Sequence, residues 1–365
     1  MRTRLQGHVP AWATSSRDRG AVPSDAVLNL TFVLSRSPEL QTQFEQLLAD
    51  QQNPDSPHYH QWLTPQQVGE QYGPTQHDLS ALREWLGSQG LTVREVAPSG
   101  MFVSVSGRAS SVTAALATDF HYFERNGGQH ISATAEPAIP SALAAVVASI
   151  SGLAEAELHP SAHIGETRLM PNAGGAHPEA TFNGSHFITP GDFATIFDIN
   201  PAYSAGYNGA GQKVAVIGRS RVTTSDVTAF ESKTGLTTNV PNIVIPTNGV
   251  DPGTTSDGDQ VEATVDVERV IGVAPGAHVD LVVSSSSGNS DGILIAAQYE
   301  VQTLRDPVMN ISFGGCEAYG GASSVALWDA LFSQAASEGI SVFVSSGDSG
   351  AAGCDAGGEL APTYQ

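Results

Sequence analysis

Apolar positions in the first half of the chain follow two periods, which predicts both strands and helices there. Residues 27–34 are a leucine-rich, β-branched run typical of a strand, whereas residues 38–52 place Leu40, Phe44 and Leu47 at helical spacing. Further helices are expected at residues 63–72, 75–90 and 109–120, and the two strands of a hairpin at residues 91–97 and 101–107, with the apolar segment 142–153 closing this half. This order of strands and helices indicates an α+β open-faced sandwich.

The second half alternates long apolar runs with amphipathic segments, which indicates another fold class. The apolar runs span residues 212–218, 278–284, 307–314 and 340–347, and the amphipathic segments between them span residues 257–273, 290–304 and 323–339. Such alternation predicts an α/β fold with a parallel sheet, helices on both of its faces, and ligands at the carboxyl ends of the strands. Residues 154–187 are rich in proline, glycine and histidine without any period, which indicates a linker that an endopeptidase can cut. We therefore expect a first domain over residues 1–153, this linker, and a second domain over residues 188–365.

The charge of the chain limits its partners. Its 365 residues carry 16 Lys and Arg against 37 Asp and Glu, a formal net charge of −21 at pH 7. Phosphate-rich surfaces attract cationic proteins, so this balance argues against a nucleic acid or an anionic membrane as the partner. No apolar run reaches the length of a membrane span, and the basic residues 1–20 lack the apolar region of a secretory signal.

Several common ligand motifs are absent from the sequence or misplaced in it. Gly209 and Gly211 precede the strand at residues 212–218 rather than follow it, so a dinucleotide fingerprint is not supported. The sequence has no P-loop, no HExxH motif and no Cys/His cluster for a metal. Cys316 and Cys354 both lie in glycine-rich surroundings, and their spacing is equally compatible with one disulfide and with two free thiols.

One predicted helix carries two carboxyl groups on a shared face. Glu262 and Asp266 are four residues apart in the segment 257–273, which brings their Cβ atoms to about 5–6 Å from each other. An exposed helix face usually pairs Glu with Lys or Arg, so the spacing is compatible with two solvated acids and with a functional pair. The residues around the pair favour the second interpretation.

These surroundings resemble a subtilisin-like peptidase in which the catalytic residues are replaced. The helix leads into the segment Gly272–Pro275 (GVAP), as in subtilases, but it presents Glu262 where they carry a histidine. The first strand ends in Gly218–Arg219 in place of their aspartate, and the segment VSSGDSG presents Asp348 in place of their oxyanion asparagine. Glu, Asp four residues later and Asp in SGDSG form a combination similar to that of the sedolisins, the serine-carboxyl peptidases.

The first half shows the same resemblance independently. Residues 55–90, 103–123 and 139–153 resemble the pro-kumamolisin-type activation prodomain of that family, and residues 188–199 resemble the start of its mature peptidase. The resemblance implies a subtilisin-like catalytic domain after a prodomain, and a secreted, monomeric, acid-acting endopeptidase zymogen. Its implied partners are protein or peptide substrates and its own prodomain.

The resemblance also implies a role for each carboxyl group. A histidine base with a pKa near ~6.5 is protonated in acid, whereas a glutamate near ~4.3 can still accept a proton. Glu262 is therefore expected to be the general base, and Asp266 to orient it while sharing a proton with it. Asp348, if protonated, is expected to donate a hydrogen bond to the oxyanion, the alternative being an ordinary loop acid. Residues 312–314 and the loop around Asp355 are expected to border the cleft.

The family's nucleophile and calcium site have no match in the sequence. The family's serine lies in a Gly-Thr-Ser motif far downstream of the oxyanion aspartate, whereas 17 residues follow Asp348 here. A similar segment, Gly253–Ser256, precedes Glu262 in a predicted loop, so no nucleophile is assigned to it. We therefore expect a chain truncated before its nucleophile, with an uncovered apolar sheet edge, poor stability and no peptide hydrolysis of its own. Calcium is expected for the family but not for this chain.

Two other functions are compatible with these residues. The first is a catalytically inactive, truncated homologue whose prodomain acts as an inhibitor or folding chaperone for an intact relative. The second is a Ser-His-Asp subtilase that uses His278, although His278 follows the GVAP turn at the start of a strand, which argues against it.

The distribution of histidine predicts a pH-sensitive contact. Ten of the 11 histidines precede residue 190, so the first half gains positive charge as the pH falls through about 6.5. Charging loosens any contact that buries a neutral histidine. We therefore hypothesise an acid-sensitive switch, with His58, His60 and His121 as the residues to replace.

Overall fold

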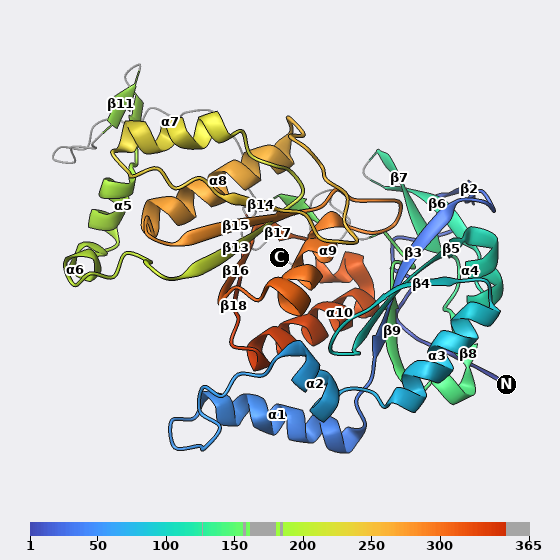
Figure 1. Ribbon diagram of the computed structural model, residues 1–365. Helices are drawn as coiled ribbons and strands as arrows, with labels where there is room; N and C mark the ends of the chain where they lie inside the picture. The colour runs from blue at the N-terminus through green and yellow to red at the C-terminus, as the bar shows by residue number, and fades with distance from the viewer. Residues whose placement is uncertain (126, 156–157, 161–179, 183–184, 348–365) are drawn as a thin grey trace.

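The computed structural model describes residues 1–125, 127–155, 158–160, 180–182 and 185–347 (Figure 1). The strands of the first half are β1 (Arg2–Arg4), β2 (Asp18–Ala21), β3 (Val27–Leu34), β4 (Thr92–Val96), β5 (Phe102–Arg108), β6 (Phe120–Arg125), β7 (Gly128–Ala133), β8 (Ala138–Pro140) and β9 (Val147–Ser151). Its helices are α1 (Pro38–Gln52), α2 (Pro65–Tyr72), α3 (Gln76–Ser88), α4 (Ala109–Leu116) and the short η1 (Ser141–Leu143).

The second half contains the remaining elements. Its strands are β10 (His159–Pro160), β11 (Ala180–Phe182), β12 (Ser185–Phe187), β13 (Lys213–Gly218), β14 (Asn242–Val244), β15 (His278–Val283), β16 (Val308–Ile311), β17 (Phe313–Gly314) and β18 (Ser341–Val344). Its helices are α5 (Pro190–Ile196), α6 (Asn200–Ser204), α7 (Thr224–Thr234), α8 (Gly258–Val273), α9 (Gly292–Tyr299), η2 (Glu300–Leu304) and α10 (Glu317–Ser337).

An antiparallel sheet in the order β4–β5–β3–β9 forms the centre of the first half. Alternate residues of β3, such as Leu28 and Phe32, are fully buried against Leu82 of α3 and Val112 of α4. This is the open-faced sandwich that the apolar periods predict, because period-two strands and period-3.6 helices each bury one face. Two smaller sheets, β2–β6–β7 and β1–β8, lie beside it.

One predicted boundary in this half is wrong. The helix expected over residues 109–120 ends at Leu116, and Ala117 takes a left-handed conformation with φ 52°. The chain then reverses into the hairpin of β6 and β7, which the sequence did not predict. Left-handed backbone at an alanine is uncommon, so the apolar pattern gave no sign of the break.

The second half is built on a parallel sheet in the order β14–β15–β13–β16–β18. Ala215 and Ile217 of β13 face α9 and α10, whereas Val216 between them faces α7 and α8. The expected α/β fold, with helices on both faces of a parallel sheet, is therefore confirmed. The carboxyl ends of its strands lie near the first half of α8, at the edge where parallel sheets bind ligands.

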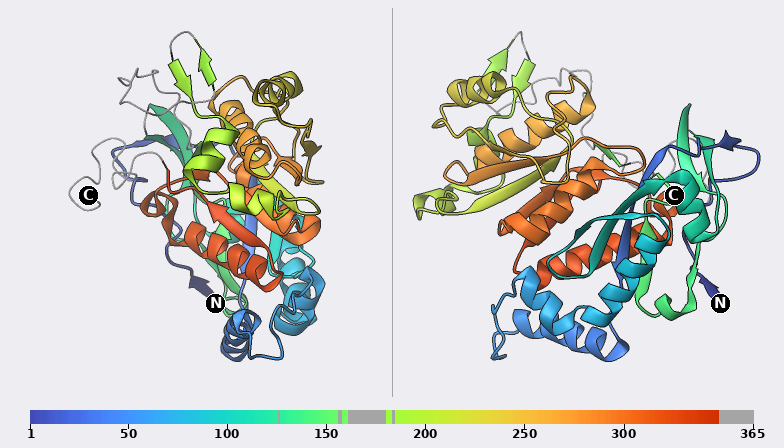
Figure 2. Two further views of the ribbon diagram at one scale, coloured as in Figure 1. Left: turned by 90° about the vertical axis from the view of Figure 1, so that its left-hand side faces the viewer. Right: turned by 45° about the vertical axis from the view of Figure 1, so that its right-hand side comes forward.

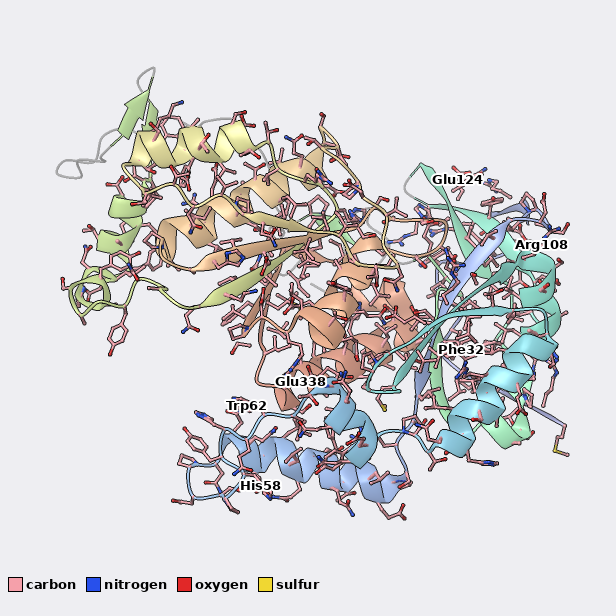
Figure 3. The ribbon with its side chains drawn as sticks, viewed as in Figure 1. Phe32, His58, Trp62, Arg108, Glu124 and Glu338 are labelled. Atoms are coloured by element: carbon pink, nitrogen blue, oxygen red, sulfur yellow. The ribbon has the colours of Figure 1, made fainter. Side chains whose placement is uncertain are left out.

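The two halves share a buried interface. Figures 1 and 2 show α10 between the parallel sheet and the first half, where it packs against β9. Val33, Met101 and Phe102 of the first half belong to the same apolar cluster as the residues of α9 and α10. Trp62 lies against Gly339 just beyond α10, and Figure 3 shows it close to Glu338.

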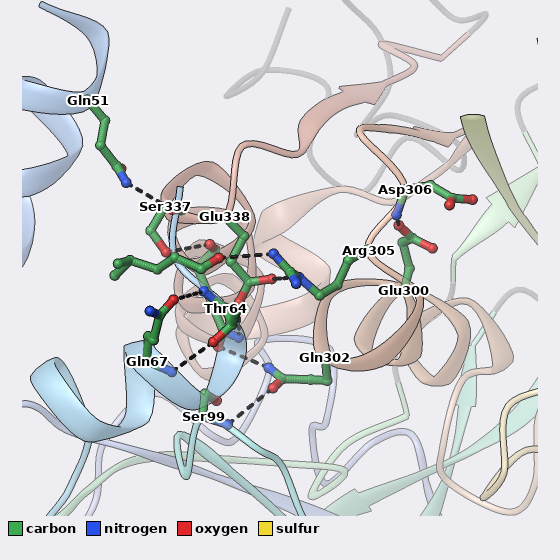
Figure 4. A network of polar contacts seen from close by, with 12 residues as sticks. Gln51, Thr64, Gln67, Ser99, Glu300, Gln302, Arg305, Asp306, Ser337 and Glu338 are labelled. Carbon is green, nitrogen blue, oxygen red and sulfur yellow. Dashed lines mark hydrogen bonds and ion pairs between the residues drawn. The ribbon is translucent and has the colours of Figure 1, made fainter. Parts of the chain in front are cut away.

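Polar contacts continue this interface at the end of α10 (Figure 4). The backbone N–H of Leu63 donates to the carbonyl of Ser337 at 3.0 Å, and a guanidinium nitrogen of Arg305 donates to the carbonyl of Leu63 at 3.1 Å. Arg305 also pairs with the buried Glu338 at 3.5 Å, and Gln51 donates to Ser337 at 3.0 Å. Backbone N–H and C=O groups of the first half therefore make direct hydrogen bonds with the second half.

β18 is one of the two edge strands of the parallel sheet in the described part of the chain, and β14 is the other. Phe343 and Val344 on β18 are 61% and 48% exposed, among the residues that the structure describes. None of the helices in that same part is long and apolar enough to cross a bilayer.

The histidines singled out for the pH-sensitive contact are not the buried ones. His58 and His60 are exposed, and His121 Nδ1 lies 2.7 Å from the carboxylate of Asp18. His8 has the required geometry, because its side chain is buried and its Nε2 accepts the N–H of Ile150 in β9 at 3.1 Å. An accepting nitrogen carries no proton, so this imidazole is neutral.

Acid is expected to break the contact between His8 and β9. Burial lowers the pKa of His8 below its ordinary 6.5, against the opposing charge of Glu136. The contact is therefore intact above pH 6.5 and is lost as the pH falls through the lowered pKa, with up to about a tenfold change in equilibrium per pH unit. Amide hydrogen exchange of Ile150 between about pH 7 and 4.5 measures this. His8→Gln, which still accepts, is expected to keep its protection, and His60→Gln serves as the control; parallel loss in wild type and His8→Gln would contradict the prediction.

Candidate active site

Helix α8 positions the two carboxyl groups singled out in the sequence. Asp257 caps the first turn of α8 by accepting the N–H of Asp259 at 3.0 Å. The inner face of this helix packs on the parallel sheet. Glu262 and Asp266 lie on that inner face, where they are 3% and 8% exposed. They are therefore not two solvated acids, and their burial requires specific partners.

The two carboxyl groups are hydrogen-bonded to each other and to side chains in and just after β16. A hydrogen bond joins the side chains of Glu262 and Asp266, which requires that they share a proton. Asn310 donates to Asp266 Oδ2 at 3.1 Å, and the Ser312 hydroxyl donates to Asp266 Oδ1 at 2.8 Å. Asp266 is thus held from both sides, and its orientation toward Glu262 is fixed.

Burial sets the protonation of this pair. The pKa of Asp266 is raised to about 7, mainly by burial and also by the charge and hydrogen bond of Glu262, while the donors Ser312 and Asn310 act in the opposite direction. A pKa of about 7 keeps Asp266 protonated throughout the acid range. Burial at this place on α8 therefore favours the protonated form of Asp266.

Arg219 fills the place at the end of β13 where subtilases carry an aspartate. Its guanidinium donates twice to Asp259 at 3.0 Å, in the first turn of α8, and once to Asp291 at 3.0 Å, at the start of α9. The same group lies over the ring of Phe313 at 5.0 Å. Arg219 therefore ties α8, α9 and β17 together and is engaged with two carboxylates of its own.

A short strand of the linker lies beside the carboxyl pair. β10 pairs antiparallel with β17, with His159 opposite Gly314 and Pro160 opposite Phe313. Pro160 also approaches α8, because a Cβ on Gly258 would lie 3.3 Å from its ring. An extended peptide can add to an exposed strand through main-chain hydrogen bonds, and β10 adds to β17 in this way.

A largely apolar cavity adjoins this strand. It has a volume of about 360 Å³, and Leu158 of the linker lies at its wall. Its other walls include Phe313, Trp328, Phe332 and Val344. The cavity is therefore suited to an apolar side chain of a peptide that pairs with β17.

The structure separates the remaining candidates from the carboxyl pair or leaves them undescribed. His278 begins β15 at the amino edge of the sheet, where its Nε2 lies 3.2 Å from Asp280. Ser256 is exposed in the turn before α8. Asp348, Cys354 and Asp355 lie outside the described residues.

Cys316 begins helix α10 near β17. Cys316 is disulfide-bonded. The chain has one other cysteine, Cys354, which lies outside the described residues. Of the two alternatives left by the sequence, the free thiol is therefore excluded at Cys316.

No group of three or more His, Cys, Asp or Glu in the described ranges is arranged to hold a metal ion. The described residues therefore do not fit the calcium ion that the family resemblance implies, and no chemical step is assigned to it.

The sequence analysis predicted no role for Asn310, Ser312 and Arg219 in holding the acidic side chains. A signal for the first two existed, because polar residues alternate with apolar ones in an otherwise buried strand.

Most of the first half matches a known protein family. Residues 14–156 match the family described as the pro-kumamolisin activation domain. The matched region includes the antiparallel sheet β4–β5–β3–β9 with its helices, and it ends before β10.

Three curated peptidases are similar to most of the chain. Sedolisin of Pseudomonas sp. (strain 101) is 29% identical over 322 residues, covering 86% of this chain and 53% of the relative. Xanthomonalisin of Xanthomonas sp. (strain T-22) is 28% identical, covering 90% and 40%, and kumamolisin of Bacillus sp. (strain MN-32) is 25% identical, covering 95% and 61%. The chain thus spans about half the length of the curated relatives it matches.

A solved structure is also similar to part of the chain. Pseudomonas sedolisin, a serine-carboxyl proteinase complexed with two molecules of pseudo-iodotyrostatin, is 29% identical, with a TM-score of 0.37 and 46% coverage of each chain.

Proposed function

Because the chain belongs to the sedolisin family and carries a pro-kumamolisin-type activation domain, we propose that it is part of a serine-carboxyl endopeptidase zymogen that acts in acid. The observation that carries the proposal is the buried, hydrogen-bonded pair of Glu262 and Asp266 beside β17. Residues 1–153 are the proposed prodomain, residues 154–187 the linker with the processing site, and residues 188–365 the N-terminal portion of the catalytic domain.

In the proposed reaction, Glu262 accepts the proton of the nucleophilic serine as that serine attacks the peptide carbonyl. Asp266 stays protonated and donates to Glu262, which orients the base and stabilises its ionised form. The protonated Asp348 donates to the oxyanion of the tetrahedral intermediate. We assign no serine of these 365 residues as the nucleophile.

The placement of the linker supports a peptidase cleft at β17. β10 pairs with β17 as an extended strand, and Leu158 lies at the wall of the apolar cavity. We propose that substrate peptides take the same place after the linker leaves. Secretion is proposed with this function, and the disulfide at Cys316 supports it, because disulfides persist in oxidising compartments.

Hydrolysis by a completed chain tests the proposal. In the completed chain, residues 1–365 are followed by the part of Pseudomonas sedolisin that lies beyond its sequence match to this chain. It is expected to cleave a mixture of unstructured peptides between about pH 3 and 5 and to lose activity toward about pH 7, where the family's acid chemistry fails. The 365-residue chain alone is expected to cleave none. A completed chain that folds, with the far-UV circular dichroism of its parent proteins, yet stays inactive in acid would contradict the proposal.

The inhibitor or chaperone function is a second candidate, because the first half has its own buried core of strands β3 and β5 with α3 and α4. The same 365-residue chain is added to active Pseudomonas sedolisin, and hydrolysis is followed in acid. Stoichiometric inhibition supports this second candidate. Unchanged hydrolysis, together with an active completed chain, supports the zymogen.

A further inference from the structure

A side-chain amide of the second half fills a gap in the sheet of the first half. β3 and β9 pair as far as Thr31 and Ser151, and Gly152 then turns away with φ 88°. The N–H and C=O of Asn29, next along β3 on that side, therefore have no partner in β9. Asn289 supplies both contacts, because its Oδ1 accepts the N–H of Asn29 at 2.8 Å and its Nδ2 donates to the C=O of Asn29 at 2.7 Å.

The surroundings of Asn289 fit this role closely. Asn289 is 4% exposed, and its Nδ2 also donates to the carbonyl of Gly152. A Cβ on Gly152 would lie 3.1 Å from that nitrogen and 2.4 Å from the carbonyl oxygen of Asn29, so a side chain there would obstruct the contact. The side chain of Asn29 in turn donates to the carbonyl of Ser287 at 3.3 Å.

Asn289 is presented by a tight turn. Ser287 and Ser290 exchange backbone hydrogen bonds at 3.0 and 3.1 Å, and Gly288 between them has φ 59°. The next residue, Asp291, begins α9 and pairs with Arg219 at the cleft. The turn is thus continuous with the elements that hold α8.

We propose that the turn Ser287–Ser290 is an element by which the catalytic half recognises the prodomain. Its Asn289 amide binds the backbone N–H and C=O of Asn29, which have no partner in β9. The partner it fits is an antiparallel sheet whose edge strand diverges at a glycine, here β3 and β9 of the same chain. The proposal rests on the proposed prodomain role of residues 1–153. Docking is measured without catalysis, so it can fail or succeed independently of peptidase activity.

Association of the two halves after a nick in the linker tests the proposal. An added protease cuts the full chain within residues 161–179, mass spectrometry identifies the fragments, and gel filtration shows whether they stay together. Wild-type fragments are expected to co-elute at about pH 7. Asn289→Asp, whose ionised carboxylate cannot donate to Asn29 or Gly152, is expected to bind about 100-fold more weakly there because buried groups lose their partners.

Acidification separates recognition from misfolding. At about pH 4 the introduced carboxyl group, which burial helps to protonate, regains one donor and one acceptor, so the affinity of the Asn289→Asp fragments is expected to approach that of wild-type fragments at the same pH. Amide exchange of Asn29 in the uncut chain is expected to follow the same pattern. Asn248→Ala, which removes an exposed contact with Glu95 across the same two halves, is the control and is expected to change affinity by less than about threefold. Wild-type fragments that separate, Asn289→Asp fragments that bind normally at about pH 7, or weakening that acid does not reverse would each overturn the proposal.

Discussion

Replacing Glu262 by glutamine is expected to reduce acid hydrolysis by the completed chain about 10²- to 10⁴-fold, the usual contribution of a general base. Glutamine keeps the size of the side chain and can still hydrogen-bond Asp266, but it cannot accept the proton of a nucleophile. The loss is therefore expected in kcat, measured from initial rates at saturating peptide, with KM changed much less.

The same substitution has a readout in the 365-residue chain itself. The charge and hydrogen bond of Glu262 raise the pKa of Asp266, so Glu262→Gln is expected to lower that pKa from about 7. Carboxyl-selective NMR titration of Asp266 measures it. Glu268→Gln is a matched control, because Glu268 lies on the same helix and is not among the groups that act on Asp266. Full activity of Glu262→Gln, or equal loss with Glu268→Gln, would exclude Glu262 as the base.

Periodicity predicted the fold class because burial acts at regular intervals in both halves. The four apolar runs of the second half all became strands of one parallel sheet, or of its continuation into β17. The hairpin β6–β7 was missed, since its start depends on one left-handed alanine, Ala117. A single backbone angle of this kind leaves no periodic trace in the sequence.

The candidate site was predicted only as far as helix spacing and family resemblance reach. The four-residue spacing predicts that Glu262 and Asp266 lie on one face of the helix. This is the apolar face of α8, which packs against the sheet. The partners Asn310 and Ser312 come from a strand 44 and 46 residues away from Asp266, and contacts at that separation depend on the topology of the sheet. The sequence shows Arg219 only as a departure from the subtilase pattern. Its two carboxylate partners, Asp259 and Asp291, meet it only in the folded chain.

A second group of buried acids lies at the opposite, amino edge of the parallel sheet. Lys213 pairs with Asp280 at 3.0 Å and with Asp306 at 3.2 Å, and the N–H of Asp306 donates to Glu300 at 2.6 Å. Glu300 has no exposed surface, and its second carboxyl oxygen has no hydrogen-bond partner among the described residues. Burial, followed by the charge of Asp306, raises the pKa of Glu300 to about 8. Lys213 therefore pairs with two of these three carboxyl groups, and the folded state favours the ionised form of Asp280 but the protonated forms of Asp306 and Glu300.

The chain is accordingly expected to be more stable in acid than at neutral pH. In the unfolded chain Glu300 ionises at its ordinary pKa of 4.5, whereas in the folded chain it stays protonated up to about 8. A carboxyl group with a raised pKa stabilises the fold fully below its ordinary pKa and loses that contribution as the pH rises toward its folded value. For Glu300 the loss is roughly 3 kcal/mol between about pH 4.5 and 7, at about 1.4 kcal/mol per pKa unit.

Glu300→Gln is expected to remove the part of this pH dependence that Glu300 contributes, because an amide stays neutral and its oxygen can still accept the N–H of Asp306. Urea unfolding at about pH 4.5, 6 and 7.5, followed by far-UV circular dichroism, gives the free energies to compare. Glu84→Gln, on an exposed turn of α3, is expected to leave the wild-type slope unchanged. Burial also raises the pKa values of Asp266, Glu268 and Glu338 to about 7, so a shallower decline of stability with pH remains in Glu300→Gln. A wild-type chain whose stability stays level or increases over this range would show that the acids at the amino edge are ionised in the fold, with Lys213 sufficient to hold them.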